Sequence, residues 1–372
     1  MKIISFYLPQ FHEMEENNRW WGKGFTEWTN MKKAKPLFPD HNQPRIPLNE
    51  NYYDLLDKNT MLWQSSIAKK NGVYGFCFYH YWFGDLQLME KPLEIFLNNS
   101  DIDIHFCFSW ANESWTRAWA SKKDEILVEQ KYGGRDEWQR HFDYLLPFFK
   151  DERYILEDGK PVFIIYRPEN IPCLNEMLLY FETLAKQNGF TGMCFMYQQV
   201  AFKKCGENDD SLFSYNIEYQ PAYALYDMKK EKKQNIIVSG LKRIKRRFHI
   251  KTRGVRNALT SVTRISYDAL WREILAAKPD GKSVAGAFVD WDNTPRRGNK
   301  GWLCDNVSVD SFQKYFSLLV DKVMTEYSTD YIFVFAWNEW AEGGYLEPDE
   351  KNEYGYLEAI RKVLSDKDQL PD

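Results

Sequence analysis

Two glutamates near the carboxyl end of the chain, Glu339 and Glu342, have the spacing and the surroundings that paired acid–base chemistry requires. Cleavage of a glycosidic bond needs two carboxyl groups in different protonation states: one donates a proton to the leaving oxygen, and the other handles the nucleophilic side. Neighbouring carboxylates repel each other when both are ionised, which raises the pKa of one and creates that difference. We therefore take Glu339 and Glu342 as the candidate catalytic pair.

Spacing alone is weak support for this pair, because two glutamates three residues apart are common on solvated helix faces. One of them could be an exposed loop residue or the partner of a helix N-cap. The catalytic interpretation is favoured by the position of the pair at the end of an apolar run, between Trp337 and the two glycines Gly343 and Gly344.

Short apolar runs alternate with longer helical patterns along the whole chain, which is typical of β–α units that form a parallel sheet. The predicted strands are Ile3–Leu8, Val73–Tyr79, Ile104–Ser109, Val162–Tyr166, Met193–Tyr197, Tyr215–Tyr219, Ala285–Asp290 and Ile332–Ala336. The predicted helices are Tyr53–Lys70, Pro92–Asn98, Glu137–Phe149, Asn175–Asn188, Tyr267–Ala277, Val309–Tyr327 and Tyr356–Leu364. Eight strands over this length favour an α/β fold of the (β/α)8 TIM-barrel type, spanning residues 1–372 as one catalytic barrel, over a doubly wound sheet.

In such a barrel the reactive groups gather at the face where the strands end. Nearly every predicted strand ends beside an aromatic ring and a hydrogen-bonding or ionisable side chain, which is the mixture that a sugar subsite needs. The candidate substrate-binding residues are Tyr7, Trp28, His80, Tyr81, Trp82, Trp110, Asn112, Glu113, Trp115, Arg167, Gln198, Glu218, Tyr219, Asp290, Trp291, Trp337, Asn338, Trp340 and Glu347. Among them, Glu113 is the carboxylate most able to take over one of the two catalytic roles.

The composition agrees with a globular sugar-binding protein and excludes several other classes. Aromatic residues make up 17% of the chain, with 14 Trp and 23 Tyr, which fits sugar stacking and a bulky core about equally well. The six cysteines form no Cys-x-x-Cys pair, so we expect no zinc site, no disulfide framework and a reducing compartment. No glycine-rich phosphate loop follows any predicted strand, and we expect no metal and no cofactor.

The chain also carries no sequence pattern of a membrane span or a signal peptide. Its longest apolar runs fall well short of the roughly 20 residues of a membrane-spanning helix. The first residues, Met1–Pro9, form too short an apolar run for a signal peptide and lack a small-residue cleavage site. We therefore expect a cytoplasmic protein.

One segment, residues 229–256, departs from the β–α pattern between the sixth and seventh predicted strands. It holds 12 Lys or Arg residues and a single acid, Glu231, while the whole chain has a net charge of −4. Its apolar residues recur at helical spacing, so it resembles a basic amphipathic helix. Such a helix can lie on an anionic membrane surface, which would make the protein peripheral at the inner membrane. We favour instead a solvated helix packed on the barrel, and we expect no nucleic-acid partner, because interleaved aromatic residues are nearly absent.

Several motifs together resemble a known family. They are Phe6–His12, Trp21–Trp28, Gly75–Phe83, Trp110–Trp115, Asn338–Gly343 and Leu346–Pro348. With these motifs, which span nearly the whole chain, it resembles the WbsX-type proteins of bacterial polysaccharide gene clusters. These proteins in turn look like the family-99 glycoside hydrolases, the endo-α-mannosidase group.

The resemblance implies roles for the two glutamates. Glu339 would be the base on the sugar's 2-hydroxyl, forming a 1,2-anhydro intermediate, and Glu342 would be the acid/base at the glycosidic oxygen of a retaining mechanism without a metal. The substrate would be an oligosaccharide or polysaccharide, either free or lipid-linked. Three functions fit: a glycoside hydrolase, a glycosyltransferase of O-antigen or capsule assembly, and a sugar-binding barrel without catalysis. We rank the hydrolase-type mechanism first because both glutamates are present and no sugar-nucleotide site is recognisable.

Overall fold

The computed structural model describes residues 1–117, 125–200, 210–226, 228 and 262–371. The basic segment 229–256 lies outside these residues, so both predictions for it remain untested. None of the helices in the described residues combines the length and the apolar character that crossing a membrane requires.

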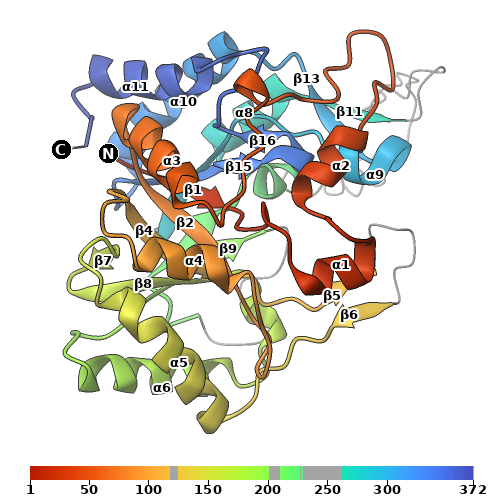
Figure 1. The fold of residues 1–372 in the computed structure, drawn as a ribbon. Coiled ribbons are helices and arrows are strands. Elements are labelled where there is room, and N and C mark those ends of the chain that lie inside the picture. Colours follow the sequence, from red (N-terminus) through yellow and green to blue (C-terminus); the bar gives the residue numbers. More distant parts are fainter. Residues whose placement is uncertain (118–124, 201–209, 227, 229–261, 372) are drawn as a thin grey trace, which may run out of the picture.

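A closed barrel of eight parallel strands forms the centre of the molecule (Figure 1). The barrel strands are β1 (Lys2–Tyr7), β2 (Val73–Trp82), β4 (His105–Trp110), β8 (Lys160–Ile165), β9 (Cys194–Gln199), β10 (Tyr215–Glu218), β12 (Ser283–Phe288) and β14 (Tyr331–Phe335). They are paired in the order β1-β14-β12-β10-β9-β8-β4-β2, and pairing of β1 with β2 closes the ring. All eight predicted strands are confirmed, and so is the TIM-barrel fold.

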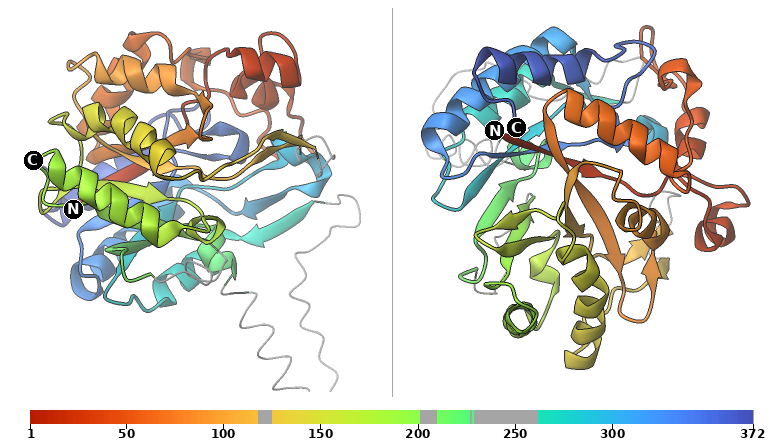
Figure 2. Two further views of the ribbon diagram at one scale, coloured as in Figure 1. Left: turned by 90° about the horizontal axis from the view of Figure 1, so that it is seen from below. Right: turned by 60° about the vertical axis from the view of Figure 1, so that its left-hand side comes forward.

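Helices surround the barrel in the two further views (Figure 2). They are α3 (Lys58–Lys70), α4 (Glu90–Leu97), α5 (Arg135–Phe149), α6 (Leu174–Gln187), α8 (Tyr267–Ala276), α10 (Val309–Glu326) and α11 (Gly355–Asp366). Each predicted helix is confirmed, although α3 begins later than the predicted Tyr53 because Asp57 caps it, accepting a hydrogen bond from the Asn59 amide at 2.9 Å.

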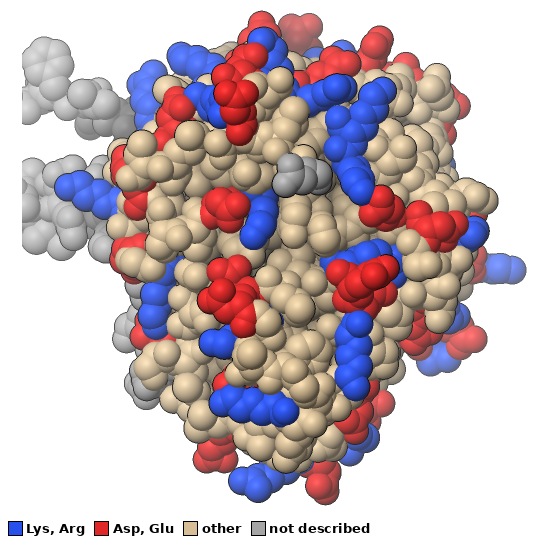
Figure 3. Space-filling model, turned by 90° about the vertical axis from the view of Figure 1, so that its left-hand side faces the viewer, with Lys and Arg blue, Asp and Glu red and all other residues tan. Residues whose placement is uncertain are grey.

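The two ends of the barrel differ in what they carry. Both termini lie together at the end where β1 begins, and the Met1 amino group donates to the Gln369 carbonyl at 3.2 Å. Figure 3 looks onto this side, where positive and negative side chains are interspersed rather than gathered by sign. The short elements that were not predicted from sequence lie mostly in the loops at the opposite end.

Most of those short elements build up the loops after the strands. They are α1 (Glu15–Trp21), α2 (Glu27–Lys33), η1 (Leu48–Glu50), β3 (Gln87–Leu88), β5 (Trp115–Thr116), β6 (Ile126–Val128), β7 (Leu156–Glu157), η3 (Pro168–Asn170), β11 (Thr263–Ser266), α9 (Thr294–Arg297), η4 (Gly298–Lys300), β13 (Trp302–Asp305), β15 (Asn338–Glu339), η5 (Trp340–Glu342) and β16 (Gly344–Tyr345). Helices α1 and α2 follow β1, α9 follows β12, and the hairpin of β15 and β16 follows β14.

The alternation of side chains along each strand separates the barrel interior from the layer beneath the helices. Phe6 packs on Tyr79 and Tyr219, with ring centroids 5.7 Å and 5.3 Å apart, across the inside of the barrel. The next residue along β1, Tyr7, faces outward, and its hydroxyl donates to Gln64 on α3 at 2.7 Å. The phase of this alternation therefore decides which residues at a strand end can reach a cavity inside the barrel mouth.

Gly286 on β12 offers a test of the tight packing between strands. A Cβ atom there would lie 1.7 Å from the Glu218 carbonyl oxygen at the end of β10, a backbone atom that cannot rotate away. We expect Gly286→Ala to lower the free energy of unfolding by about 3 kcal/mol or more in urea denaturation. Gly281→Ala is the matched control, because a Cβ at Gly281 meets nothing within 4 Å. Equal stability of the two variants would contradict this packing.

Candidate active site

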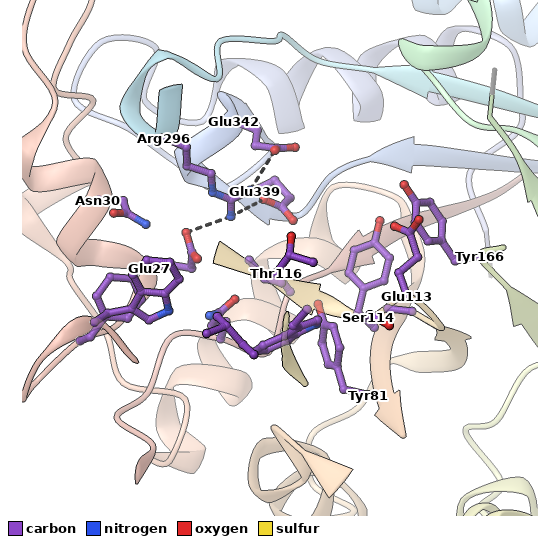
Figure 4. Close-up of a pocket in the computed structure, with 18 of the residues that line it drawn as sticks. Glu27, Asn30, Tyr81, Glu113, Ser114, Thr116, Tyr166, Arg296, Glu339 and Glu342 are labelled. Atoms are coloured by element: carbon purple, nitrogen blue, oxygen red, sulfur yellow. Dashed lines mark hydrogen bonds and ion pairs between the residues drawn. The ribbon is translucent and has the colours of Figure 1, made fainter. Parts of the chain in front are cut away.

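A cavity of about 490 Å³ opens at the end of the barrel where the strands terminate. Six of the residues predicted from sequence line it: Tyr81, Glu113, Trp115, Tyr219, Glu339 and Glu342. Figure 4 shows Glu339 and Glu342 on one side of the cavity and Glu113 on the other. The structure thus brings both glutamates of the candidate pair to one cavity, together with aromatic rings.

A single arginine joins the two glutamates to a third one. Nη1 of Arg296 lies 2.9 Å from Oε1 of Glu342, and its Nη2 lies 2.9 Å from Oε2 of Glu27 and 3.4 Å from Oε2 of Glu339 (Figure 4). Strands β1, β14 and β12 are neighbours in the barrel, so the loops that carry Glu27, the pair and Arg296 meet there. Within the described parts of the chain, no group of three or more His, Cys, Asp or Glu side chains is arranged to hold a metal ion.

The charges in this cluster are unbalanced, because one guanidinium faces three carboxylates. Burial raises the pKa of Glu339, Arg296 lowers it, and the negative charges of Glu342 and Glu27 raise it again, to about 8. With a pKa of about 8, Glu339 is mostly protonated at pH 7. Burial contributes more to the raised pKa of Glu339 than the neighbouring charges do.

The hairpin that carries the pair is fixed to the first strand. The Asn338 side chain accepts a hydrogen bond from the Leu8 amide at 2.8 Å and donates to the Leu8 carbonyl at 3.0 Å, and it is fully buried. Gly343 has a φ of +70°, a left-handed conformation that suits glycine. A Cβ at Gly344 would lie 2.4 Å from the Phe335 ring. The two glycines thus let the chain turn tightly after Glu342.

Glu347 holds the same hairpin in place through hydrogen bonds. It accepts hydrogen bonds from the Trp340 indole at 2.6 Å, the Gln64 amide at 2.6 Å and the Tyr53 hydroxyl at 2.8 Å. Burial raises the pKa of Glu347 to about 7, although these donors oppose the rise. Glu347 and Trp340 are therefore hydrogen-bonded to each other, and neither lines the cavity.

The loop after β12 is tied to the pair through its backbone. The Asp292 amide donates to the Glu342 carbonyl at 2.7 Å, and the Asp292 carboxylate accepts from His41 and Gln43. Burial raises the pKa of Asp292, but hydrogen bonds from His41 and the charge of Arg45 outweigh it and lower the pKa to about 2. Asp290 pairs with Arg45 at 2.7 Å. These charges hold the loop that presents Arg296.

The opposite wall has a second ion pair. Arg167 lies 2.9 Å from Glu113 and 2.5 Å from Glu169, and Asn112 fixes the Arg167 backbone by hydrogen bonds of 2.8 Å to both its amide and its carbonyl. Burial raises the pKa of Glu113, against the charge of Arg167. A further carboxylate, that of Glu113, thus faces the cavity across from the pair (Figure 4).

Aromatic rings complete the walls of the cavity. Trp21 and Phe25, from the loop after β1, lie with ring centroids 5.9 Å apart, and Trp115 meets Tyr81 edge to face at 5.3 Å. The floor carries the hydroxyls of Tyr79 and Tyr219, which are 2.9 Å apart. Flat apolar faces beside fixed hydroxyls suit the C–H faces and hydroxyls of sugar rings.

Several residues predicted to contact substrate face the helices instead, because of strand alternation. On β2, Tyr79 and Tyr81 line the cavity, whereas His80 bonds to His141 of α5 at 2.9 Å and the Trp82 indole donates to Glu137. On the neighbouring strand β4, Trp110 also faces outward, and its indole donates to the Trp82 carbonyl at 3.0 Å. These outward residues, like Tyr7, pack the helix layer and do not line the cavity.

The other predicted residues that do not line the cavity contact residues of the barrel and its loops. The Trp28 indole donates to the Tyr53 carbonyl at 2.8 Å, and Gln198 donates to Ser109 at 3.0 Å inside the barrel. The remaining members are placed as follows: Glu218 accepts from the Tyr327 hydroxyl at 2.9 Å, Trp291 stacks on Trp302 at 5.0 Å, and Trp337 packs on Phe76 at 4.8 Å.

Sequence reasoning missed Glu27 and Arg296, the two residues that complete the charge cluster. Glu27 lies inside the Trp21–Trp28 motif, where its aromatic neighbours were the available signal. Arg296 follows the end of β12 by a short loop, and no local pattern separates it from Arg297. Tyr79 and Tyr166, also missed as cavity residues, stand at strand ends beside residues that were chosen.

The chain is similar to known proteins over nearly its whole length. The model of the family described as Glycosyltransferase WbsX matches residues 3–360. Two curated relatives, both named "Uncharacterized protein WxcX" and from two strains of Xanthomonas campestris pv. campestris, are each 29% identical over 371 residues. Each match covers 98% of this chain and 49% of the relative, so the chain spans about half the length of the curated relatives it matches.

Solved structures share the fold. The GH99 endo-alpha-mannosidase from Bacteroides thetaiotaomicron matches with a TM-score of 0.56 at 13% identity, covering 100% of this chain and 98% of that chain. A structure described as a glycoside hydrolase-like protein matches with a TM-score of 0.57 at 10% identity, covering 97% and 93%. The resemblance stated from the motifs is confirmed by these matches. The solved structures show the fold, and the chain belongs to the WbsX glycosyltransferase family.

Proposed function

We propose that this chain breaks glycosidic bonds of a bacterial surface polysaccharide or its precursor by a retaining mechanism that uses Glu339 and Glu342. One observation carries the proposal: both side chains line the same cavity and share the guanidinium of Arg296, at 3.4 Å and 2.9 Å. Retaining cleavage needs two carboxyl groups at one sugar, and this cavity supplies them beside stacking rings.

The proposed steps begin at the 2-hydroxyl of the sugar. Glu339, in its ionised form, takes the 2-hydroxyl proton while the 2-oxygen attacks the anomeric carbon, and Glu342 donates its proton to the leaving oxygen. The products are a 1,2-anhydro sugar and a released glycan. Glu342 then removes a proton from an incoming hydroxyl, whose oxygen attacks the anomeric carbon and opens the three-membered anhydro ring. Glu339 returns its proton to the 2-oxygen. Two inversions give net retention.

The proposed substrate contacts are the cavity-lining members of the predicted set. Tyr81 and Trp115 offer ring faces, Tyr219 offers a hydroxyl, and Glu113 offers a carboxylate on the far wall. The predicted residues outside the lining would act by positioning the loops. A lipid-linked substrate, a cytoplasmic location and membrane contact through residues 229–256 remain predictions from sequence.

Transfer to a glycan acceptor is the second candidate, and the description of the family as a glycosyltransferase favours it. In the proposed steps, the incoming hydroxyl can belong to water or to another sugar, so hydrolysis and transfer share the first half of the reaction. They differ in the acceptor alone.

Neutralising either glutamate tests the pair. We expect Glu339→Gln and Glu342→Gln each to lower the turnover of end-labelled surface-polysaccharide oligosaccharides by about 10²–10⁴-fold, because proton transfer is lost. Glu15→Gln is the control, since that side chain is exposed on α1 and pairs only with Arg19 among the described residues. Turnover of both variants within about tenfold of the wild type would mean that the pair is not catalytic.

The pH dependence tests which glutamate is the base. Because burial, with the charges of Glu342 and Glu27, raises the pKa of Glu339 to about 8 despite Arg296, a base at Glu339 is mostly protonated at pH 6. With an activated aryl glycoside, whose leaving group needs no proton from Glu342, we expect kcat/KM to rise about tenfold per pH unit below pH 8 and to level off above it. A fall of kcat/KM above pH 8 would instead make Glu339 the acid and exchange the two roles.

A nucleotide-sugar assay separates glycoside cleavage from the usual transferase chemistry. We expect no saturable binding of uridine or guanosine diphosphate sugars in calorimetry, since four glutamates line the cavity and three of them already engage Arg296. Saturable binding, followed by nucleotide release when an acceptor glycan is added, would establish a nucleotide-dependent transferase and overturn the proposed donor.

A further inference from the structure

Glu27 belongs to the charge cluster, although it lies far from the candidate pair in the sequence. It is the first residue of α2, and its Oε2 contacts Nη2 of Arg296 at 2.9 Å, across 269 residues of chain. The exposed fraction of the Glu27 side chain is 6%, and that of Arg296 is 7%. An ion pair buried this deeply must be arranged by the fold rather than by chance encounter at the surface.

Glu27 and Glu339 compete for one nitrogen of the guanidinium. Nη2 is 2.9 Å from Glu27 and 3.4 Å from Glu339, whereas Nη1 serves Glu342 at 2.9 Å. Since the attraction between charges grows as the distance shrinks, Glu27 takes the larger share of Nη2. Nη1 thus contacts Glu342 closely, whereas Glu339 has only a partial share of Nη2.

We propose that Glu27 is a positioning residue of this active site, which holds Arg296 by Nη2 and thereby places Glu339 and Glu342 in unlike electrostatic surroundings. The contacts stand by themselves, but the meaning of this difference for catalysis rests on the function proposed above. Without Glu27, the planar guanidinium is able to offer one nitrogen to each member of the pair, and the two surroundings become alike.

The other groups that face Glu339 do not supply this difference. The hydroxyl groups of Tyr79, Tyr81 and Tyr219 face it from β2 and the end of β10, and burial raises the pKa of each above its usual range, so they stay neutral between pH 5 and pH 9. Arg297 also lines the cavity and is exposed to solvent. Besides burial, the charges of Arg296, Glu342 and Glu27 therefore set the state of Glu339.

Holding Arg296 in this way also suits the proposed steps. When Glu339 takes the 2-hydroxyl proton, its negative charge disappears, and a guanidinium held only by the pair would lose a partner at that moment. Glu27 still holds Nη2 in place. The positive charge therefore needs no rearrangement while the proton moves, which is the condition for electrostatic preorganisation.

Carbon-13 NMR of protein labelled at the glutamate carboxyl carbon measures the protonation of Glu339 directly. Its resonance is identified by its loss in Glu339→Gln, and its titration midpoint is followed from pH 5 to pH 10. We expect the midpoint to fall by about one pH unit or more in Glu27→Gln, because Nη2 then turns to Glu339 and favours its charged form. Glu27→Asp, with a shorter side chain, should give a smaller shift in the same direction. Glu15→Gln is the control and should give none.

The two Glu27 variants give the experiment a defined negative outcome. Midpoints in Glu27→Gln and Glu27→Asp within about 0.3 pH unit of the wild type would overturn the proposal, since a purely structural glutamate would leave Glu339 unchanged. If Glu27→Gln does not fold, as judged by circular dichroism, the Glu27→Asp midpoint decides alone.

The titration uses no substrate, so its failure is distinct from failure of the proposed function. A shifted midpoint together with full turnover in Glu339→Gln would keep the role of Glu27 and remove the catalytic pair. An unshifted midpoint with lost turnover in Glu339→Gln would remove the role of Glu27 and keep the catalytic pair. In active protein, Glu27→Gln should also move the acidic limb of kcat/KM to lower pH by the same amount as the midpoint, which a change in folding alone would not do.

Discussion

One buried guanidinium shared by three carboxylates is the interaction on which the account of this site depends. Arg296 contacts Glu27, Glu339 and Glu342 within 3.4 Å, in a setting where each of the three side chains is mostly withdrawn from water. A single positive charge cannot neutralise three negative ones, so a proton must remain in the cluster at neutral pH. The fold decides where it remains, because burial and the competition for Nη2 both act against the ionised form of Glu339. In the proposed mechanism Glu339 acts as the base, so it must lose this proton before it can accept the one from the 2-hydroxyl.

The barrel makes this cluster possible through strand order. Glu27 follows β1, the pair follows β14, and Arg296 follows β12, and these strands are neighbours although they are distant in the sequence. Beneath the cluster, Asn338 binds the Leu8 backbone and Glu347 binds Trp340, so the hairpin that carries the pair rests on β1. The buried polar residues in this region, which the sequence marks as candidate substrate contacts, have partners within the protein and hold the loops.

The sequence predicts the barrel well and the cavity only in part, for physical reasons. Strands and helices follow from periodic burial, so their number and approximate bounds are accessible from sequence. Which side chains at a strand end point into the barrel is not accessible from sequence. This is why His80 and Tyr81 are equal candidates in the sequence but lie on opposite sides of β2. Arg296 and Glu27 were missed because their value comes from a contact across 269 residues, which no local spacing reveals. Glu339 and Glu342 were found because they are close in the chain as well as in space.

The most direct measurement is a crystal structure of the Glu342→Gln protein with a bound surface-polysaccharide oligosaccharide. This substitution removes the proposed acid, keeps the shape of the side chain and leaves Glu339 in place to receive the 2-hydroxyl. The account predicts one sugar ring between residues 339 and 342, with its 2-hydroxyl within hydrogen-bonding distance of Glu339 and its glycosidic oxygen facing residue 342. A ring whose glycosidic oxygen instead faces Glu113, with no sugar hydroxyl at Glu339, would contradict the central claim and move the chemistry to the opposite wall.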